Sequence, residues 1–266
     1  VMEYAFIGGG NMGWAMASAL IGKGVCPPGE ILVVEPEEAN RKRLGDMGCA
    51  VMPQVTVELG RAAVVVLAVK PQNAGEVLEQ VRSHMASSQV VVSIMAGITL
   101  GTLQRGLDHM PVVRVMPNTP AQVGLGMNVY HAAPEVGAKQ LKAVVALLEA
   151  SGESLAVATE EAIDAATAVS GSGPAYVFFL AEHWTQAARE LGFSAEEADL
   201  LVQQTLIGAT ALWRSVRLPP ATLREQVTSK GGTTAAALEH LNRQGTGEAV
   251  REAVNKAYQR AKELGR

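Results

Sequence analysis

The first half of the chain alternates short, mainly apolar runs with longer segments in which apolar and polar residues repeat at helical spacing. The apolar runs have the length of buried strands. They predict strands at residues 3–7, 30–35, 63–69, 89–95 and 112–116, and the segments between them predict helices from Gly13 to about Lys23 and over residues 37–46, 73–85 and 99–107. The run at 63–69 is apolar at every position, as expected for a strand covered on both faces. This alternation predicts a doubly wound, mainly parallel α/β sheet.

The pattern changes near residue 158, and beyond it no apolar run is typical of a strand. Before that point, residues 124–131 are expected to add one or more strands, and residues 134–151 a helix. After it, helical spacing predicts helices at residues 160–169, 176–191, 195–216, 220–227, 234–244 and 246–264. Ser194 and Glu197 have the spacing of a capping box. We therefore expect a mixed α/β domain over residues 1–157 and an all-helical domain over residues 158–266.

The long helices of the second half are apolar nearly all round rather than along one stripe. Helices of this kind are usually buried on several sides. A small helical domain has too little interior to bury them all. We therefore expect a homo-oligomer, with a dimer built from interleaved helices of this domain.

Composition narrows the class of protein. Of the 266 residues, 48% are hydrophobic and 18% are charged, which excludes a disordered chain. The net charge of −4 argues against nucleic-acid binding, which needs a basic face. No apolar run approaches the roughly 20 residues that cross a bilayer, so we expect no membrane association. Cys26 and Cys49 lack metal-site spacing; we expect no metal, reduced thiols and a cytoplasmic protein without a signal peptide.

A glycine motif stands between the first predicted strand and the first predicted helix. Gly8, Gly10 and Gly13 have the G-x-G-x-x-G spacing of a dinucleotide-binding turn. In such a turn the first glycine permits the tight bend, the second lets the backbone approach a pyrophosphate, and the third lets helix and strand pack closely. The context predicts a Rossmann-like domain that binds a nicotinamide dinucleotide.

Glu35 ends the second predicted strand and bears on the choice of cofactor. An acidic side chain at this place usually holds the ribose 2′-hydroxyl of NAD(H) and repels the 2′-phosphate of NADP(H). Arg41, Lys42 and Arg43 follow within about two helical turns. They either pair with a phosphate or form a solvated helix face, and the sequence leaves both readings open.

Three further loops follow predicted strands and are expected at the same edge of the sheet, where ligands bind in open α/β folds. They are residues 68–72, residues 95–97 and the two-proline turn at residues 116–120. Lys70 is either a proton donor, a hydrogen-bond partner of the cofactor, or a surface lysine. The small residues Ala96 and Gly97 would let a nicotinamide ring lie close to the backbone.

With these loops in order, the chain resembles the pyrroline-5-carboxylate reductase family over essentially its whole length. The segments that carry the likeness read IGGGNMG at residues 7–13, AVKPQ at 68–72, RVMPNTP at 114–120, SGSGPAY at 170–176 and PATLREQVTSKGGTTAAALEHLN at 220–242. The resemblance implies NAD(P)H-dependent reduction of L-1-pyrroline-5-carboxylate to L-proline. It also implies a helical domain that dimerises, with dimers assembled into a larger ring such as a decamer.

The resemblance also assigns residues by position. The family's cofactor contacts correspond to Ile7, Gly8, Gly9, Gly10, Asn11, Met12, Glu35, Ala68, Val69, Lys70, Pro71, Met95, Ala96 and Gly97, and its substrate contacts to Glu160, Thr167, Ser229, Gly231, Gly232, Thr233 and Thr234. Two positions depart from the family pattern. Many members carry a small polar residue in place of Glu35 and an asparagine in place of Val55. Both departures bear on the family's usual preference for NADPH, and Glu35 favours some use of NADH.

The chemistry that the resemblance implies makes modest demands on side chains. A hydride moves from the nicotinamide to the carbon of a cyclic C=N bond, and a protonated imine is already electrophilic, so a strong general acid is not needed. The substrate carboxylate needs an anion site, and residues 229–234 precede a predicted helix whose first amides attract anions. Thr234 and Lys70 are the candidate catalytic residues, with Thr234 able to bond the ring nitrogen.

Two other classes remain as alternatives. One is another two-domain imine or β-hydroxyacid reductase, which would be expected to carry a lysine on the first helix after the nucleotide domain; residues 160–172 contain none. The other is a non-catalytic nicotinamide sensor, which would tolerate loss of the anion site at residues 229–234.

Overall fold

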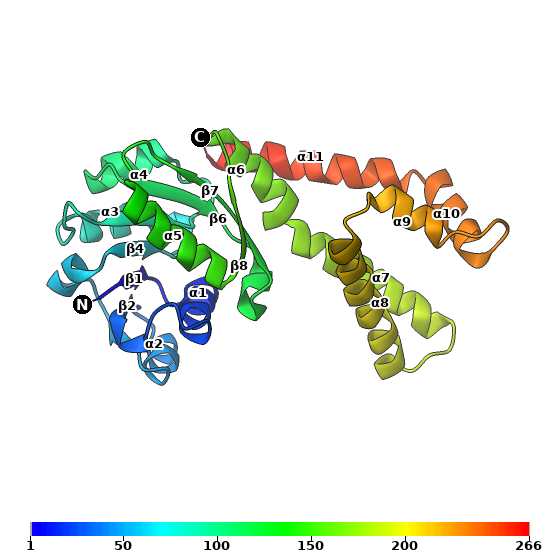
Figure 1. Cartoon of the computed structure of the whole chain (residues 1–266), viewed down its shortest axis with the longest axis horizontal. Coiled ribbons are helices and arrows are strands. Elements are labelled where there is room, and N and C mark those ends of the chain that lie inside the picture. The colour runs from blue at the N-terminus through cyan, green and yellow to red at the C-terminus, as the bar shows by residue number, and fades with distance from the viewer. Residues whose placement is uncertain (1, 266) are drawn as a thin grey trace. The chain divides into compact units, whose positions relative to one another are not determined.

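The computed structural model describes residues 2–265, which divide into two compact units (Figure 1). The first unit contains residues 2–174 together with residues 257–265, and the second runs from Ala175 to Lys256. The first is a sheet covered by helices and the second is entirely helical. The predicted fold class is therefore confirmed.

One eight-stranded sheet forms the centre of the first unit, in the order β3-β2-β1-β4-β5-β6-β7-β8. The strands are β1 (Tyr4–Ile7), β2 (Ile31–Val34), β3 (Ala50–Met52), β4 (Val64–Leu67), β5 (Val90–Ser93), β6 (Val112–Met116), β7 (Gly126–Ala132) and β8 (Gly152–Ala156). The first six are parallel, whereas β7 is antiparallel to β6 and parallel to β8. The chain moves outward from β1 in both directions, which places a topological switch point between β1 and β4.

Helices cover both faces of this sheet. On one face lie α1 (Asn11–Gly22), α2 (Glu38–Gly45) and α5 (Ala138–Ala150), and on the other lie α3 (Ala74–Arg82) and α4 (Leu100–Leu107). Along β1, Tyr4 and Phe6 join the first cluster, whereas Ala5 and Ile7 join the second. Because both faces are buried, the strand needs apolar residues at every position, as its sequence predicts.

Two strands were not predicted. β3 has three residues, too few to show a period, and β8 reads GESLA, with exposed Glu153 and half-buried Ser154. β8 lies at the edge of the sheet, so part of it faces solvent and carries polar residues. An edge strand of this kind lacks the apolar run by which the central strands are recognised.

The helical part of the chain begins with α6 (Glu161–Ala166) and a π-helical turn (Thr167–Gly171), and continues with α7 (Gly173–Glu190), α8 (Ala195–Val216), α9 (Pro220–Gln226), α10 (Thr233–Arg243) and α11 (Thr246–Leu264). The capping box is confirmed: Ser194 Oγ accepts from the N–H of Glu197, whose carboxylate accepts from the N–H of Ser194. α10 begins at Thr233 rather than Thr234, because Gly232 is extended and serves as the N-cap.

The change to an all-helical chain falls close to the expected boundary between residues 157 and 158, since β8 ends at Ala156. The compact first unit nevertheless runs on to Pro174. The reason is that α6 packs against β6 and β7, and Asp164 on α6 bonds Arg114 on β6 at 2.8 Å. Secondary structure and compactness therefore change at different positions along the chain.

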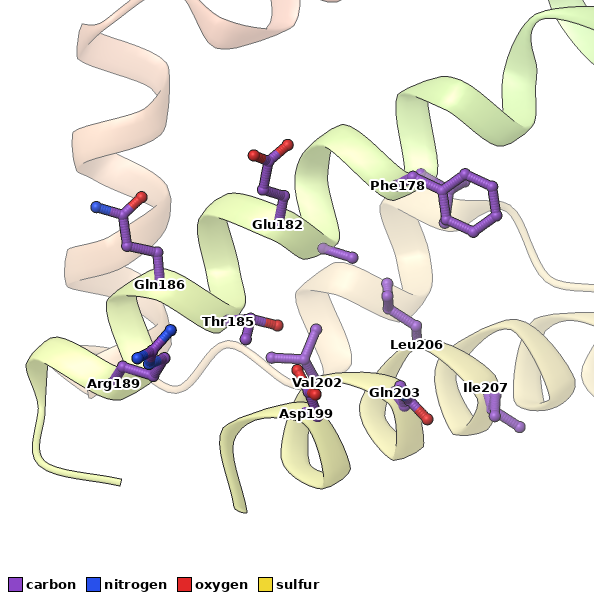
Figure 2. A pocket seen from close by; sticks show the side chains of 12 residues that line it. Phe178, Glu182, Thr185, Gln186, Arg189, Asp199, Val202, Gln203, Leu206 and Ile207 are labelled. Carbon is purple, nitrogen blue, oxygen red and sulfur yellow. The ribbon is translucent and has the colours of Figure 1, made fainter. Parts of the chain in front are cut away.

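Apolar side chains are exposed along α7 and α8 of the second unit. Phe178 is 67% exposed and Ile207 is 60% exposed. A cavity of about 720 Å³ between the two helices is lined by Val177, Phe178, Ala181, Glu182, Thr185, Gln186, Arg189, Asp199, Val202, Gln203, Leu206 and Ile207 (Figure 2). Within residues 2–265, no helix combines the length and the apolar character that crossing a bilayer requires.

Candidate functional site

The glycine loop joins β1 to α1 at the carboxyl edge of the sheet. Gly8 has φ +106°, and a Cβ there would lie 2.5 Å from the carbonyl oxygen of Ala68. A Cβ at Gly13 would collide with the carbonyl oxygen of Gly8. These two glycines are therefore required by the turn and by the packing of helix on strand, as the motif predicts.

Gly10 differs from its neighbours, because a Cβ at this position would meet no atom within 4 Å. No packing contact within residues 2–265 requires a glycine there, but a ligand approaching the backbone would. Gly10 is also the N-cap of α1 and offers no side-chain cap, so the amides of Asn11 and Met12 face outward from the helix start. This arrangement suits the pyrophosphate of a dinucleotide.

Glu35 follows β2 and is only 7% exposed. One carboxylate oxygen accepts a hydrogen bond from the N–H of Gly9 at 2.7 Å, and the other accepts from the N–H of Glu37 at 2.9 Å. The backbone thus fixes both oxygens, and a negative charge lies directly beside the glycine loop.

The basic run on α2 separates into three environments. Lys42 is exposed and pairs with Asp46 at 2.9 Å. Arg41 donates to the carbonyl oxygens of Glu35, at 2.9 Å, and of Pro36. Arg43 lies over the ring of Trp14, with its guanidinium carbon 4.7 Å from the ring centroid. The reading as a plain solvated face therefore fits Lys42 alone.

The loops at residues 68–71 and 95–97 follow β4 and β5, which are parallel to β1, so all three end at one edge of the sheet. Lys70 is exposed at this edge and starts a short 3₁₀ turn at Pro71–Asn73. Ala68, Val69 and Ala96 are half-buried. Met95 is only 2% exposed and belongs to the core, so a ligand would meet little more than its backbone.

Gly97 has a packing role that its sequence does not reveal. Its φ is +76°, and a Cβ there would lie 2.6 Å from the carbonyl oxygen of Leu264 near the end of α11. The loop after β5 is therefore closed on one side by the end of the chain.

Glu160 takes part in a charge cluster around the buried side chain of Arg114. Its Oε1 accepts from the backbone N–H of Leu100 at 2.7 Å and from Arg114 at 3.1 Å, while Arg114 also binds Asp164 at 2.8 Å. The Arg114 side chain is 4% exposed. The cluster lines a cavity of about 400 Å³ that Tyr258 and Lys262 also border. The predicted substrate residue Glu160 is thus already engaged by a cation and by the start of α4.

Thr167 opens the π-helical turn that follows α6, and its hydroxyl donates to the carbonyl of Ile163 at 2.8 Å. Asn118 ties this turn to the loop after β6. Its amide donates to the carbonyl oxygen of Ser170 at 3.0 Å, and its side-chain oxygen accepts from the N–H of Met127 at 2.8 Å. Sequence reasoning did not assign Asn118 a role, although it stands between the two prolines of the rim turn. π-helical turns often occur at functional sites.

The turn at residues 229–234 belongs to the second unit and leads into α10. The N–H of Gly232 donates to the carbonyl of Ser229 at 3.1 Å, and a Cβ at Gly232 would collide with the Ser229 hydroxyl. Ser229 and Thr233 are exposed, and Thr234 is half-buried. The first amides of α10 have no acceptor within the helix, so they are available, with the hydroxyls, to an anion.

Across residues 2–265 there is no group of three or more His, Cys, Asp or Glu side chains that could hold a metal ion.

Comparison with known proteins agrees with this arrangement. A family model described as pyrroline-5-carboxylate reductase dimerisation matches residues 160–264, and one described as NADP oxidoreductase, coenzyme F420-dependent, matches residues 3–97. The pyrroline-5-carboxylate reductase of Pseudomonas aeruginosa is 40% identical over 262 residues, covering 98% of this chain and 96% of that protein.

Two solved structures are similar over their whole length. A pyrroline-5-carboxylate reductase from Coxiella burnetii has a TM-score of 0.92 at 33% identity and covers 100% of this chain and 99% of its own. The NADP-bound pyrroline carboxylate reductase of Plasmodium falciparum has a TM-score of 0.89 at 29% identity, with coverages of 100% and 98%. Fold, glycine loop and full-length similarity lead to one conclusion: the chain belongs to the pyrroline-5-carboxylate reductase family.

Proposed function

We propose that this protein is a reductase that converts L-1-pyrroline-5-carboxylate to L-proline with NADPH or NADH. The observation that carries the proposal is the open space at Gly10 beside the exposed amides of α1, in a chain whose full-length relatives bear this enzyme's name. The hydride comes from the reduced nicotinamide, and the protein contributes binding and orientation.

The cofactor site that we propose comprises the glycine loop, Glu35 and the loops after β4 and β5. Residues Ile7 to Met12 offer amides to the pyrophosphate, and Gly10 leaves the room that it needs. The loops at residues 68–71 and 95–97 follow the adjacent parallel strands β4 and β5. Both loops therefore lie at the carboxyl edge of the sheet, where we place the cofactor. Lys70 is exposed there and is a candidate partner of the cofactor or source of a proton.

The substrate site that we propose comprises Ser229, Gly231, Gly232, Thr233 and Thr234. Their amides and hydroxyls bind the carboxylate, and Thr234 bonds the ring nitrogen, where a proton must be held after the hydride reaches the adjacent carbon. Hydrogen bonds to a charged group such as the substrate carboxylate contribute about 1.5 to 3 kcal/mol each. Glu160 and Thr167 remain candidate neighbours; the bonds of Glu160 to Arg114 and Leu100 favour an orienting role for it.

We also propose that the protein is a homodimer formed by the helical unit, and that such dimers assemble into a larger ring. The match of a dimerisation family model to residues 160–264 and the exposed apolar side chains of α7 and α8 support this. Sedimentation velocity should give a dimer or a multiple of it, and a monomer would contradict the proposal. The cytoplasmic location stays a prediction.

The test of the activity is oxidation of NADPH or NADH on addition of pyrroline-5-carboxylate, with chromatographic identification of proline as the product. A cyclic imine without the carboxylate is the matched control, and it should react far more slowly because it cannot use the anion site. No turnover with either cofactor would overturn the proposal. Equal rates with both imines would favour a general imine reductase instead.

A further inference from the structure

We propose that Arg43, held over the ring of Trp14, is the residue that binds the 2′-phosphate of NADPH and so sets the choice between NADPH and NADH. The inference rests on the proposed use of a nicotinamide cofactor. It assigns to one side chain the role that the sequence leaves divided among Arg41, Lys42 and Arg43.

The position of Arg43 is the first argument. Its Nη2 lies 3.4 Å from the carbonyl oxygen of Gly9, in the loop expected to face the dinucleotide. Its guanidinium carbon is 4.7 Å from the centroid of the Trp14 ring, near the start of α1. The ring and the loop hold the cation beside the glycine motif, so little side-chain freedom is lost on binding an anion.

The second argument is that the Arg43 guanidinium has no carboxylate partner among the described residues and makes one long hydrogen bond, to the Gly9 carbonyl at 3.4 Å. Lys42 is paired with Asp46, and Arg41 is bonded to the carbonyls of Glu35 and Pro36. None of the ion pairs found in the described part of the chain involves Arg43. Its Nε is buried and has no hydrogen-bond partner among residues 2–265, and the same is true of Trp14 Nε1.

Buried donors without acceptors are rare and costly, and their presence on two stacked residues calls for an explanation. A phosphate offers several strong acceptor oxygens to a guanidinium. The Arg43 guanidinium, whose charge has no carboxylate partner among residues 2–265, is therefore suited to a ligand that carries a phosphate.

Local charge is the third argument. The Glu35 carboxylate accepts from the backbone N–H of Gly9, and the Arg43 guanidinium donates to the backbone carbonyl of Gly9. The negative charge of Glu35 and the positive charge of Arg43 therefore offset each other beside Gly9. Glu35 can still accept from a ribose hydroxyl, while Arg43 offsets its repulsion of a 2′-phosphate. The pair therefore allows both cofactors, which Glu35 alone would not.

The test is calorimetric titration of the whole protein with NADP⁺ and with NAD⁺, without substrate. In Arg43→Gln the Kd for NADP⁺ should rise at least about 10-fold, as expected for loss of one charge-assisted contact. The Kd for NAD⁺ should stay within about twofold, because NAD⁺ lacks the 2′-phosphate. Arg43→Lys should keep most of the NADP⁺ affinity, and Trp14→Leu should lose part of it.

Lys42→Gln is the matched control, since it removes the same charge from the neighbouring position and should leave both Kd values unchanged. Raising the salt concentration should weaken NADP⁺ binding more in the wild type than in Arg43→Gln. Equal losses for both cofactors in Arg43→Gln, or no loss for either, would overturn the assignment. A wild type that binds NAD⁺ but not NADP⁺ would overturn it and leave the reductase intact, whereas binding of neither would overturn the proposed function as well.

Discussion

The carboxylate of Glu35 accepts a 2.7 Å hydrogen bond from the backbone N–H of Gly9, so the end of β2 and the glycine loop after β1 are joined through one side chain. The other carboxylate oxygen is held by the N–H of Glu37. Glu35 therefore has two roles at once. It fixes the shape of the loop, and in the cofactor site proposed above it sets the charge that the cofactor meets.

Replacing Glu35 by serine should separate these roles. We expect the ratio of kcat/KM for NADPH to that for NADH to rise about 10-fold, or about 1.4 kcal/mol, because the repulsion of the 2′-phosphate is removed. The melting temperature should fall, since the N–H groups of Gly9 and Glu37 lose their acceptor. Glu38→Ser, which removes an exposed charge three residues away, is the control. An unchanged cofactor ratio would show that Glu35 acts on loop shape alone.

Thr234→Ala should impair the reaction without affecting the cofactor. We expect kcat/KM for pyrroline-5-carboxylate to fall about 100-fold, which corresponds to one or two oriented hydrogen bonds. The Kd for NADP⁺ should not change, because the proposed role of Thr234 is to bond the substrate and not the cofactor. Steady-state kinetics measures kcat/KM, and calorimetry measures the Kd for NADP⁺. Thr102→Ala, which removes an exposed hydroxyl from α4, should leave both quantities unchanged; a Thr234 variant with wild-type kinetics would exclude this residue from the site.

Arg114→Met should be strongly destabilising, because it leaves the carboxylates of Glu160 and Asp164 without their cation. Removing one partner of a buried ion pair typically costs about 3 to 5 kcal/mol, and we expect about 3 here because both carboxylates are partly exposed. Urea unfolding at constant protein concentration measures the loss. Arg82→Met is the control: it breaks an exposed pair with Asp108 and should cost less than about 1 kcal/mol. Equal losses in the two variants would contradict the importance of the cluster.

Tyr4 should make the folded state less stable at high pH. Burial, together with the nearby Glu3 carboxylate, raises the pKa of Tyr4 from 10.0 to about 12. In the unfolded chain the phenol therefore ionises first, so its contribution to stability is complete below pH 10 and is lost as the pH rises toward 12. One such group gives a slope of at most about 1.4 kcal/mol per pH unit. Tyr4→Phe should flatten the fall in unfolding free energy over this range, and an unaltered slope would exclude Tyr4 as its source.

The central strands could be predicted because their physics is local. A strand covered on both faces is apolar at each position, and β1, β2 and β4 show this in their sequences, while β5 and β6 depart from it only at Ser93 and Arg114. β3 and β8 are short or half-exposed, and they exist because neighbouring strands offer them partners. The local sequence of β3 or β8 carries no pattern that indicates this pairing.

The same contrast holds at the site. The glycine loop is recognisable because its requirements lie within six consecutive residues, Gly8 to Gly13. The bonds from Arg114 to Glu160 and Asp164 join residues 46 and 50 positions apart and depend on how α6 packs on the sheet. Likewise, nothing near Arg43 in the sequence shows that it will lie over Trp14 rather than in solvent.

The contact between Gly97 and Leu264 has a consequence for how the chain folds. Residues 257–265 pack onto a unit whose other residues are all made before the helices of Ala175–Lys256. During synthesis the residues of the sheet therefore emerge first. The unit lacks residues 257–265 until the helices of Ala175–Lys256 have been synthesised. Closing that contact requires a long loop, and such non-local steps are slow. The sheet-containing unit, although synthesised first, is thus expected to complete its native structure only after the helical unit has been synthesised.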